Sequence, residues 1–163
     1  MYIHRLPLLL MLMLCANAFA GDATLRQPRP DLITAGQPSA QQLRDAAANG
    51  VTTVIDLRRA DEDRGYDEAA LAEQLGLRYV RLPIAGPSDI TEANARTLDR
   101  LLKQDGGKTL LHCASANRAG ALLSVIDARI NGAAVEDALK LGRDAGMTSL
   151  EPAARATLET PTP

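Results

Sequence analysis

Aromatic residues are scarce in this chain of 163 residues, which has no tryptophan, one phenylalanine and three tyrosines. Tyr2 and Phe19 lie within the first twenty residues, so Tyr66 and Tyr79 are the only aromatic residues beyond them. This scarcity excludes an aromatic platform on which nucleic-acid bases or sugars would stack. Lysine and arginine are scattered along the chain and the formal net charge is -2, so neither nucleic acid nor an anionic membrane surface is expected as the main partner.

Cysteine and histidine are scarcer still beyond residue 20, where only Cys113 and His112 occur. A single cysteine cannot form an internal disulfide, and a structural zinc site needs four ligands, so we expect no disulfide, metal or other cofactor. The chain is long enough for one domain to bury a core without such crosslinks. Cys113 is then either a buried, inert thiol or a reactive one, and its neighbours decide between the two.

The first twenty residues have the composition of a signal peptide. Arg5 is followed by the apolar run Leu6–Cys15, which is too short to span a bilayer, and Ala18 and Ala20 stand at the positions that a signal peptidase reads. We therefore predict cleavage after Ala20 and a periplasmic or secreted protein. Cys15 resembles a lipoprotein cysteine, but the residue before it, Leu14, is larger than such sites use, so no stable membrane anchor is expected.

Strands and helices alternate along the rest of the chain. We expect an extended lead-in at residues 21–31, one domain at 32–158 and a tail at 159–163. Apolar and β-branched runs predict strands at 51–57, 77–84 and 108–113. Capping signals, among them a capping box at Ser39 and Gln42, predict helices at 40–49, 67–75, 91–104, 119–130, 133–145 and 150–158. This order predicts an α/β fold with a central, mostly parallel sheet of about four strands flanked by helices.

One segment carries residues suited to chemistry, and it joins the last predicted strand to the helix after it. The strand ends at Cys113, and Arg118 opens the helix. The residues between them are small or polar: Ala114, Ser115, Ala116 and Asn117. Ligands of parallel sheets bind beyond the carboxyl ends of strands, and N–H groups that converge in such a loop form an anion site. The same field favours the thiolate of Cys113, and a planar guanidinium can hold two oxygens of the anion.

His112 precedes the cysteine, and successive residues of a strand point to opposite faces. Its ring should therefore lie on the other side of the sheet from the thiol, which argues against a Cys–His hydrolytic pair. We expect a buried imidazole that bonds the loop backbone and shapes the loop, or else a histidine with a purely structural role in the core.

The sequence HCASANRAG resembles the phosphate-binding loop of cysteine-dependent phosphatases of the tyrosine and dual-specificity type. More narrowly, the chain resembles the bacterial group related to beta-lactamase-hydrolase-like proteins, on the segments AGQPSAQQL, VTTVIDLR, LRYVRLPI and KTLLHCASANRAGAL. The resemblance implies that Cys113 attacks the phosphorus of a phosphorylated substrate. Arg118 and the loop amides of residues 114–117 would hold the phosphate oxygens, and water would then hydrolyse the phosphocysteine.

Three features differ from the common phosphatase pattern. The loop between Cys113 and Arg118 is one residue shorter, as it is in the bacterial group and in rhodanese-type sulfurtransferases. Ala119 replaces a serine or threonine whose hydroxyl assists the leaving thiolate, a role that Ser115 could fill in part. Ala116 stands where glycine is frequent, so a positive φ there would be strained.

The resemblance also implies an acid that protonates the leaving oxygen. Such phosphatases carry an aspartate on the loop after the preceding strand, and the matching segment, 85–90, contains Asp89. Asp89 is equally suited to cap the helix predicted at 91–104. Asp56, in a strand, and the run Asp61–Asp63, expected to be solvated, are weaker candidates. Arg58 would add a second cation near the site, but we expect it to be solvated.

Three functions remain open. The leading one is an exported phosphatase that cleaves a phosphate monoester, on a protein or a small molecule, with a cysteine nucleophile and no metal. The second is a rhodanese-like sulfurtransferase that carries a persulfide on Cys113, and the short loop suits it. The third is a non-catalytic relative that binds an anion, and the missing hydroxyl at Ala119 suits it.

Overall fold

The computed structural model describes residues 23–104 and 106–161. The predicted signal peptide and its cleavage after Ala20 lie outside the described residues, as do residues 162–163 of the tail. Within the described part of the chain, no helix has both the length and the apolar character needed to cross a membrane.

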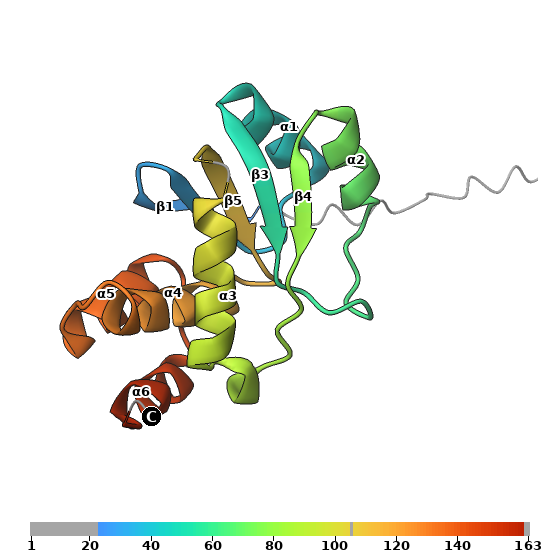
Figure 1. Ribbon diagram of the computed structural model, residues 1–163. Helices are drawn as coiled ribbons and strands as arrows, with labels where there is room; N and C mark the ends of the chain where they lie inside the picture. The colour runs from blue at the N-terminus through green and yellow to red at the C-terminus, as the bar shows by residue number, and fades with distance from the viewer. Residues whose placement is uncertain (1–22, 105, 162–163) are drawn as a thin grey trace, which may run out of the picture.

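A five-stranded sheet forms the centre of the fold, with the strand order β1-β2-β5-β3-β4 (Figure 1). The strands are β1 (Arg26–Arg29), β2 (Leu32–Ala35), β3 (Val51–Asp56), β4 (Arg78–Arg81) and β5 (Lys108–His112). All neighbouring strands are parallel except β1 and β2, which pair antiparallel. The predicted α/β fold with a mostly parallel sheet is confirmed.

Two strands were not expected from the sequence, and β1 lies inside the segment 21–31 that was predicted as a lead-in. In this strand Arg26 pairs with Thr34 and Arg29 with Leu32, so the sheet begins before residue 32. Pro28 is tolerated because β1 is the outermost strand, where a backbone N–H can be absent without breaking a ladder inside the sheet. Strands of four residues are also too short to show a clear alternation of apolar and polar positions.

Helices cover both faces of the sheet (Figure 1). The two on one face are α1 (Ala40–Ala48) and α2 (Glu68–Gln74), and those on the other are α3 (Glu92–Lys103), α4 (Asn117–Arg129), α5 (Val135–Asp144) and α6 (Glu151–Glu159). The predicted capping box at α1 is confirmed, because the Ser39 hydroxyl accepts from the Gln42 N–H while the Gln42 side chain accepts from the Ser39 N–H. Helix α4 begins two residues before its predicted start, which brings Arg118 into its first turn.

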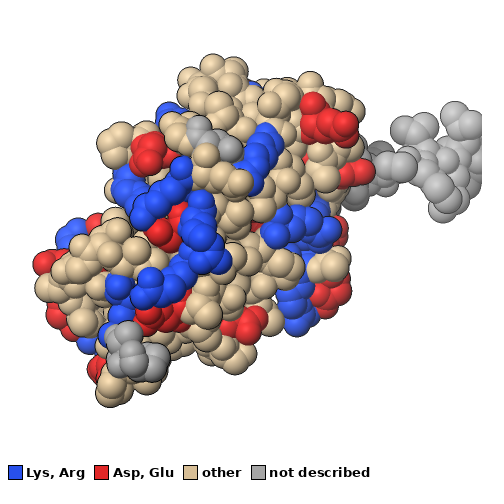
Figure 2. Space-filling view, viewed as in Figure 1, with Lys and Arg blue, Asp and Glu red and all other residues tan. Residues whose placement is uncertain are grey.

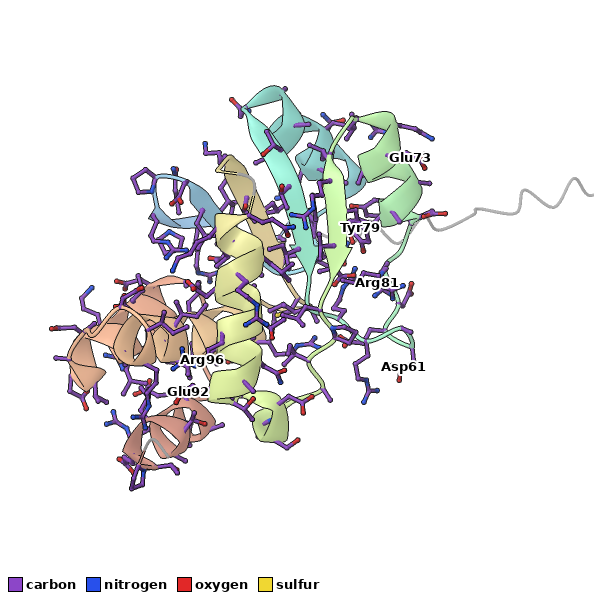
Figure 3. The ribbon with its side chains drawn as sticks, viewed as in Figure 1. Asp61, Glu73, Tyr79, Arg81, Glu92 and Arg96 are labelled. Atoms are coloured by element: carbon purple, nitrogen blue, oxygen red, sulfur yellow. The ribbon has the colours of Figure 1, made fainter. Side chains whose placement is uncertain are left out.

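The surface of α3 gathers cations that are only scattered along the sequence. Figure 2 shows lysine and arginine side chains in a broken band on this face, with carboxylates beside them. Arg96 pairs with Glu92, which lies next to it in Figure 3, and Lys103 pairs with Asp99 one turn away. Because Arg96 and Lys103 are paired with carboxylates of their own helix, these two cations do not alter the expectation about nucleic acid.

Gly146, after α5, packs against the loop that precedes α4. Its φ is +108°, and a Cβ at this position would lie 2.5 Å from the Cβ of Ala116. Gly132 has a similar backbone, with φ +79°, but its Cβ would meet no atom within 4 Å. Alanine at either position would strain the backbone, but only alanine at Gly146 would also clash with the loop. Comparing the two substitutions therefore distinguishes the two effects.

We predict that Gly146→Ala destabilises the protein more than Gly132→Ala. Both variants force alanine into a positive φ, which costs roughly 1–2 kcal/mol, and Gly146→Ala adds an overpacking penalty of about 1–3 kcal/mol. Urea unfolding of the two variants and of the parent protein measures the difference. An equal loss in the free energy of unfolding in both variants would show that Ala116 and its loop shift at no cost to make room for a methyl group at Gly146.

Candidate active site

The cysteine loop connects β5 to α4 and is held on one side by the segment after β2. The Cys113 N–H donates to the carbonyl of Ala35 at 3.3 Å, and the Gln37 N–H donates to the carbonyl of Ala114 at 3.2 Å. Gly36 lies between them, where a Cβ would come within 2.9 Å of the Ala114 oxygen, so only glycine allows this approach. The loop is thus fixed to the parallel sheet at the carboxyl edge, where ligands of such sheets bind.

Ala116 turns the chain from the loop into α4. Its φ is +68°, the only positive φ among the non-glycine residues that the structure describes. The strain expected at this position is confirmed. Ala116 is the N-cap of α4, and no side chain bonds the first N–H groups of the helix, which also have no acceptor within it. These N–H groups are donors for an anion at the helix N-terminus.

Asn117 anchors the start of α4 to the turn before α6. Its Oδ1 accepts from the N–H groups of Thr148, at 2.8 Å, and Leu150, at 3.2 Å. Its Nδ2 donates to the Ser149 hydroxyl at 2.7 Å. The side chain is therefore used to hold the helix in place, and only the backbone N–H of Asn117 is left to contact a phosphate. Ala114 and Ser115, earlier in the loop, are exposed.

Cys113 and His112 lie on opposite faces of the sheet, as the alternation of strand residues predicts. Cys113 is fully buried and belongs to the apolar cluster under α3–α6, together with Leu57 and Ile84. His112 faces α2, where its Nε2 lies 3.0 Å from a carboxylate oxygen of Glu68. A Cys–His hydrolytic pair is thus absent from the described residues.

Arg118 is clamped by Glu62, a residue that the sequence placed in a solvated charge run. Nη1 and Nη2 of Arg118 donate to the two carboxylate oxygens of Glu62 at 2.6 and 2.7 Å, and Nη1 also donates to the carbonyl of Ile84 at 2.9 Å. A guanidinium has five N–H donors, and these bonds use three of them. The Nε–H and one Nη2–H, which share an edge of the planar group, remain for another acceptor.

The charge of this pair is stable in neutral solution. The hydrogen bonds to Arg118 lower the pKa of Glu62 to about 2. The Glu62 carboxylate in turn raises the pKa of Arg118, although burial opposes it, and the nearby Cys113 sulfur acts in the same direction as Glu62. Glu62, together with the carbonyl of Ile84, therefore holds the orientation of the Arg118 guanidinium. The prediction that the run Asp61–Asp63 is solvated is correct for Asp61, which points outward in Figure 3, and wrong for Glu62.

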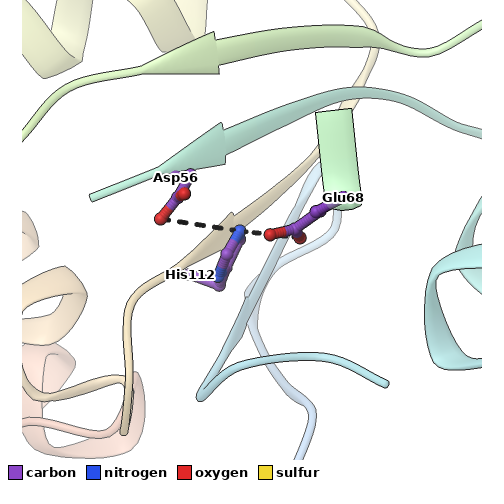
Figure 4. A group of neighbouring side chains, drawn as sticks. All are labelled: Asp56, Glu68 and His112. Atoms are coloured by element: carbon purple, nitrogen blue, oxygen red, sulfur yellow. Dashed lines mark ion pairs between the residues drawn. The ribbon is translucent and has the colours of Figure 1, made fainter. Parts of the chain in front are cut away.

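Beneath the loop, His112 contacts carboxylates from two elements, as Figure 4 shows. Its Nε2 lies 3.0 Å from Oε1 of Glu68, in α2, and 4.0 Å from Oδ1 of Asp56, at the end of β3. All three residues are fully buried. The expected hydrogen bond from the imidazole to the loop backbone is not what the structure shows, because the parallel register places Asp56 beside His112 and α2 adds Glu68.

Arg58 supplies the positive charge that these carboxylates need. Its Nε donates to Asp56 at 3.1 Å and its Nη2 to Glu68 at 2.8 Å, and only 1% of the side chain is exposed. The expectation that Arg58 is solvated is wrong, because two buried carboxylates require a paired cation. Burial raises the pKa of Asp56, but the hydrogen bonds that Arg58 and the Tyr79 hydroxyl donate to this carboxylate outweigh burial and hold the pKa at about 2.

The side chains of Asp56, Glu68 and His112 have ligand atoms within 4.8 Å of one another, a spacing that would suit a metal ion. However, Arg58 already bonds both carboxylates, and Arg64 bonds Asp56 at 3.0 Å. A divalent cation among them would face two guanidinium groups at short range. The chemistry of this donor set therefore fits a charge-balanced support for the loop better than a metal site. Asp56 is likewise unsuited to be a catalytic acid, since its oxygens are occupied.

Asp89 lies in a short 3₁₀ helix, Pro87–Asp89, and its carboxylate accepts from the Ala85 N–H at 2.7 Å. It does not cap α3, since Thr91 is the N-cap and its hydroxyl accepts from the Asn94 N–H. The capping alternative for Asp89 is therefore wrong. Ile84, next to Ala85, accepts from Arg118, so the segment that carries Asp89 contacts the guanidinium.

The sheet order, the loop from β5 to α4 and the arginine at the start of that helix define the fold class of tyrosine and dual-specificity phosphatases. No family model matches the chain. The chain is 37% identical over 112 residues to the beta-lactamase hydrolase-like protein of Xylella fastidiosa (strain Temecula1). The matched segment covers 64% of this chain and 26% of that protein. The chain thus spans about a quarter of the length of the curated relatives it matches. The resemblance stated from HCASANRAG is confirmed.

Two solved structures extend the similarity to the whole domain. A protein of Shewanella putrefaciens CN-32 described as "Putative phosphatase (DUF442)" matches with a TM-score of 0.62 and 26% identity, over 85% of this chain and 88% of that one. TpbA of P. aeruginosa, solved in complex with pTyr, matches with a TM-score of 0.65 and 20% identity, over 87% of this chain and 91% of that one.

We predict that Arg58→Met destabilises the protein by about 3–5 kcal/mol, because it leaves two buried carboxylates without their cation. The neighbouring Arg59 is the matched control, since half of its side chain is exposed and its partner Asp61 is on the surface. Arg59→Met should cost less than about 1 kcal/mol. The free energy of unfolding in urea measures both. A similar small loss in both variants would mean that Arg58 does not compensate the charge under the loop.

We predict that the stabilisation by Glu62 depends on pH. The folded pKa of about 2 lies below the ordinary value of 4.5, so the ion pair stabilises the protein fully above that value and loses this effect as the pH falls toward 2. Glu62→Gln should therefore lower the free energy of unfolding at pH 7, and its difference from the parent should shrink between pH 5 and pH 3. A difference that stays constant over this range would contradict the pairing.

Proposed function

We propose that this chain is a cysteine-dependent phosphatase that cleaves a phosphate monoester through a phosphocysteine on Cys113. The observation that carries the proposal is the unused edge of the Arg118 guanidinium, which Glu62 holds in place beside the uncapped N-terminus of the helix that follows the Cys113 loop. A phosphate above the sulfur would accept from this edge and from the N–H groups of residues 114–118. These donors match the negative charge that develops on its equatorial oxygens.

The reaction then runs in two steps. The Cys113 thiolate forms a bond to phosphorus while the bond from phosphorus to the leaving oxygen breaks, and Asp89 gives its proton to that oxygen. Water next attacks the phosphocysteine, the sulfur–phosphorus bond breaks, and the thiolate and inorganic phosphate are released, with Asp89 accepting the proton. The contact between Arg118 and Ile84, five residues before Asp89, supports this role, since it brings the acid's segment to the phosphate site.

A phosphorylated molecule is the substrate that we propose, and the similarity to TpbA, solved in complex with pTyr, supports it. The composition of residues 1–20 supports export, with cleavage after Ala20 and activity in the periplasm or outside the cell. Neither the proposed substrate nor the proposed export is taken from the curated relatives, because this chain covers only a part of their length.

Two observations favour a second candidate, a relative that binds the anion without turnover. Cys113 is fully buried, and Ala119 provides no hydroxyl for the leaving thiolate. An assay of hydrolysis separates this candidate from the phosphatase. An assay with thiosulfate and cyanide tests the sulfurtransferase, which the short loop would also suit.

We predict that the purified protein releases phosphate from an aryl phosphate and that Cys113→Ser abolishes this release, because a serine hydroxyl is not ionised at neutral pH. Phosphate or vanadate should still bind to Cys113→Ser, as the N–H donors and Arg118 remain. Release that survives the substitution would exclude the phosphocysteine. Binding without release in the parent protein would favour the non-catalytic relative, and thiocyanate formation without phosphate release would favour the sulfurtransferase.

We predict that Asp89→Asn lowers kcat by about 10²–10⁴-fold for alkyl phosphates, whose leaving oxygen needs a proton. The loss should be much smaller for 4-nitrophenyl phosphate, whose leaving group is stable as an anion. Asp144, which pairs with Lys140 on the surface of α5, is the matched control, and Asp144→Asn should leave both rates unchanged. An equal decrease in kcat for both substrates would show that Asp89 is not the catalytic acid.

A further inference from the structure

A cavity of about 560 Å³ opens beside the cysteine loop, on the side of the exposed residues Ala114 and Ser115. Its opposite walls come from β1 and from the segment before α2, and they include Arg26, Arg64 and Tyr66. A volume of this size accommodates a small organic molecule, which is far more than one phosphate group needs. Ala114 and Ser115 belong both to the loop and to the lining, so the cavity adjoins the loop that the proposed function assigns to the phosphate.

The lining of the cavity contains two arginines and no carboxylate. Arg64 is already paired, since its Nε donates to Asp56 and its Nη1 to the carbonyl of Glu62. Arg26 is different. Its Nη1 donates a long hydrogen bond, 3.4 Å, to the carbonyl of Thr24, and no carboxylate among the described residues pairs with it. The cavity therefore holds a positive charge that has no anionic partner in the described part of the chain.

Arg26 also lies next to the cysteine loop. A Cβ at Gly146 would lie 3.3 Å from Nη1 of Arg26 and 2.5 Å from the Cβ of Ala116. Because both atoms lie close to this one position, they also lie close to each other. Ala116 is the residue that turns the loop into α4. The guanidinium thus stands within a few ångströms of the loop, at a distance that one small substrate can bridge.

We propose that Arg26 binds a second anionic group on the leaving side of the substrate. This inference rests on the proposed phosphatase activity and adds a substrate class to it, namely phosphate monoesters whose leaving group carries a carboxylate or a second phosphate. The carbon body between the two anions lies against the apolar part of the cavity, which Ala23, Pro38 and Ala40 provide beside Tyr66. A guanidinium can accept either group through two parallel hydrogen bonds.

Equilibrium binding to the full chain tests the proposal. We use Cys113→Ser, which prevents turnover, and compare phenyl phosphate with 4-carboxyphenyl phosphate by calorimetry. The carboxylate should strengthen binding roughly tenfold, as expected for a charge-assisted bond at a partly exposed site. Adding Arg26→Gln should remove this advantage and leave the affinity for phenyl phosphate unchanged. Adding Arg29→Gln, in the same strand but paired with Asp31 outside the cavity, should preserve it.

The outcomes separate this inference from the proposed function. Equal affinity for the two ligands, no measurable binding of either, or an equal effect of Arg26→Gln on both would overturn it, even if the parent protein releases phosphate. A preference that depends on Arg26 would support the second anion site even if no phosphate is released. Should Arg26→Gln fail to fold, Arg26→Lys and a salt series replace it. The preference should then weaken in the lysine variant and fall with rising salt, and a preference insensitive to both would count against the proposal.

Discussion

The buried guanidinium of Arg58 is the interaction on which the site depends. It allows Asp56, at the end of β3, and Glu68, in α2, to lie together with no contact to water. His112, the residue before the cysteine, packs against the same two carboxylates. Without the cation the two negative charges would repel each other in a poorly polarisable surrounding, and β3, α2 and β5 could not meet beneath the loop.

On the other side of the loop from Arg58, the Arg118 guanidinium bonds Glu62 through one part and leaves another part for an anion. Glu62 and the carbonyl of Ile84 occupy one part of the Arg118 guanidinium, and its Nε–H and one Nη2–H remain for another acceptor. Glu62 is therefore a positioning residue, because it orients the arginine and does not take the edge that an anion would use. This division also explains how a cation can stand in the first turn of α4, where the helix dipole opposes it, since Glu62 compensates the charge.

The functional residues missed from the sequence are those whose role comes from a pairing. Glu62 lies in the polar run after β3, and nothing in that run distinguishes it from Asp61 or Asp63. Its position after a strand that neighbours β5 is a usable signal, since the carboxyl ends of parallel strands meet at one edge. Arg58 was misplaced for a similar reason. An arginine is usually solvated, and Arg58 is buried only because β3 and α2 pack together and enclose it with the carboxylates of Asp56 and Glu68.

The sequence alone determined the six helices and three of the five strands, the position of the cysteine loop and the opposite orientation of His112 and Cys113. These features follow from local rules, namely the period of each element, its capping residues and the alternation of side chains along a strand. It also showed that a positive φ at Ala116 would be strained. Only the tertiary structure decided that β1 joins the sheet, that Thr91 caps α3 in place of Asp89, and that Glu62 and Arg58 are paired. Glu62 meets Arg118 from a segment 56 residues away, and Arg58 is enclosed only because β3, α2 and β5 pack together, so a pattern of neighbouring residues carries no information about either pairing. The pairing of β1 with β2 and the cap at Thr91 are local contacts, but the sequence offers more than one suitable arrangement at each place and the packed structure decides between them.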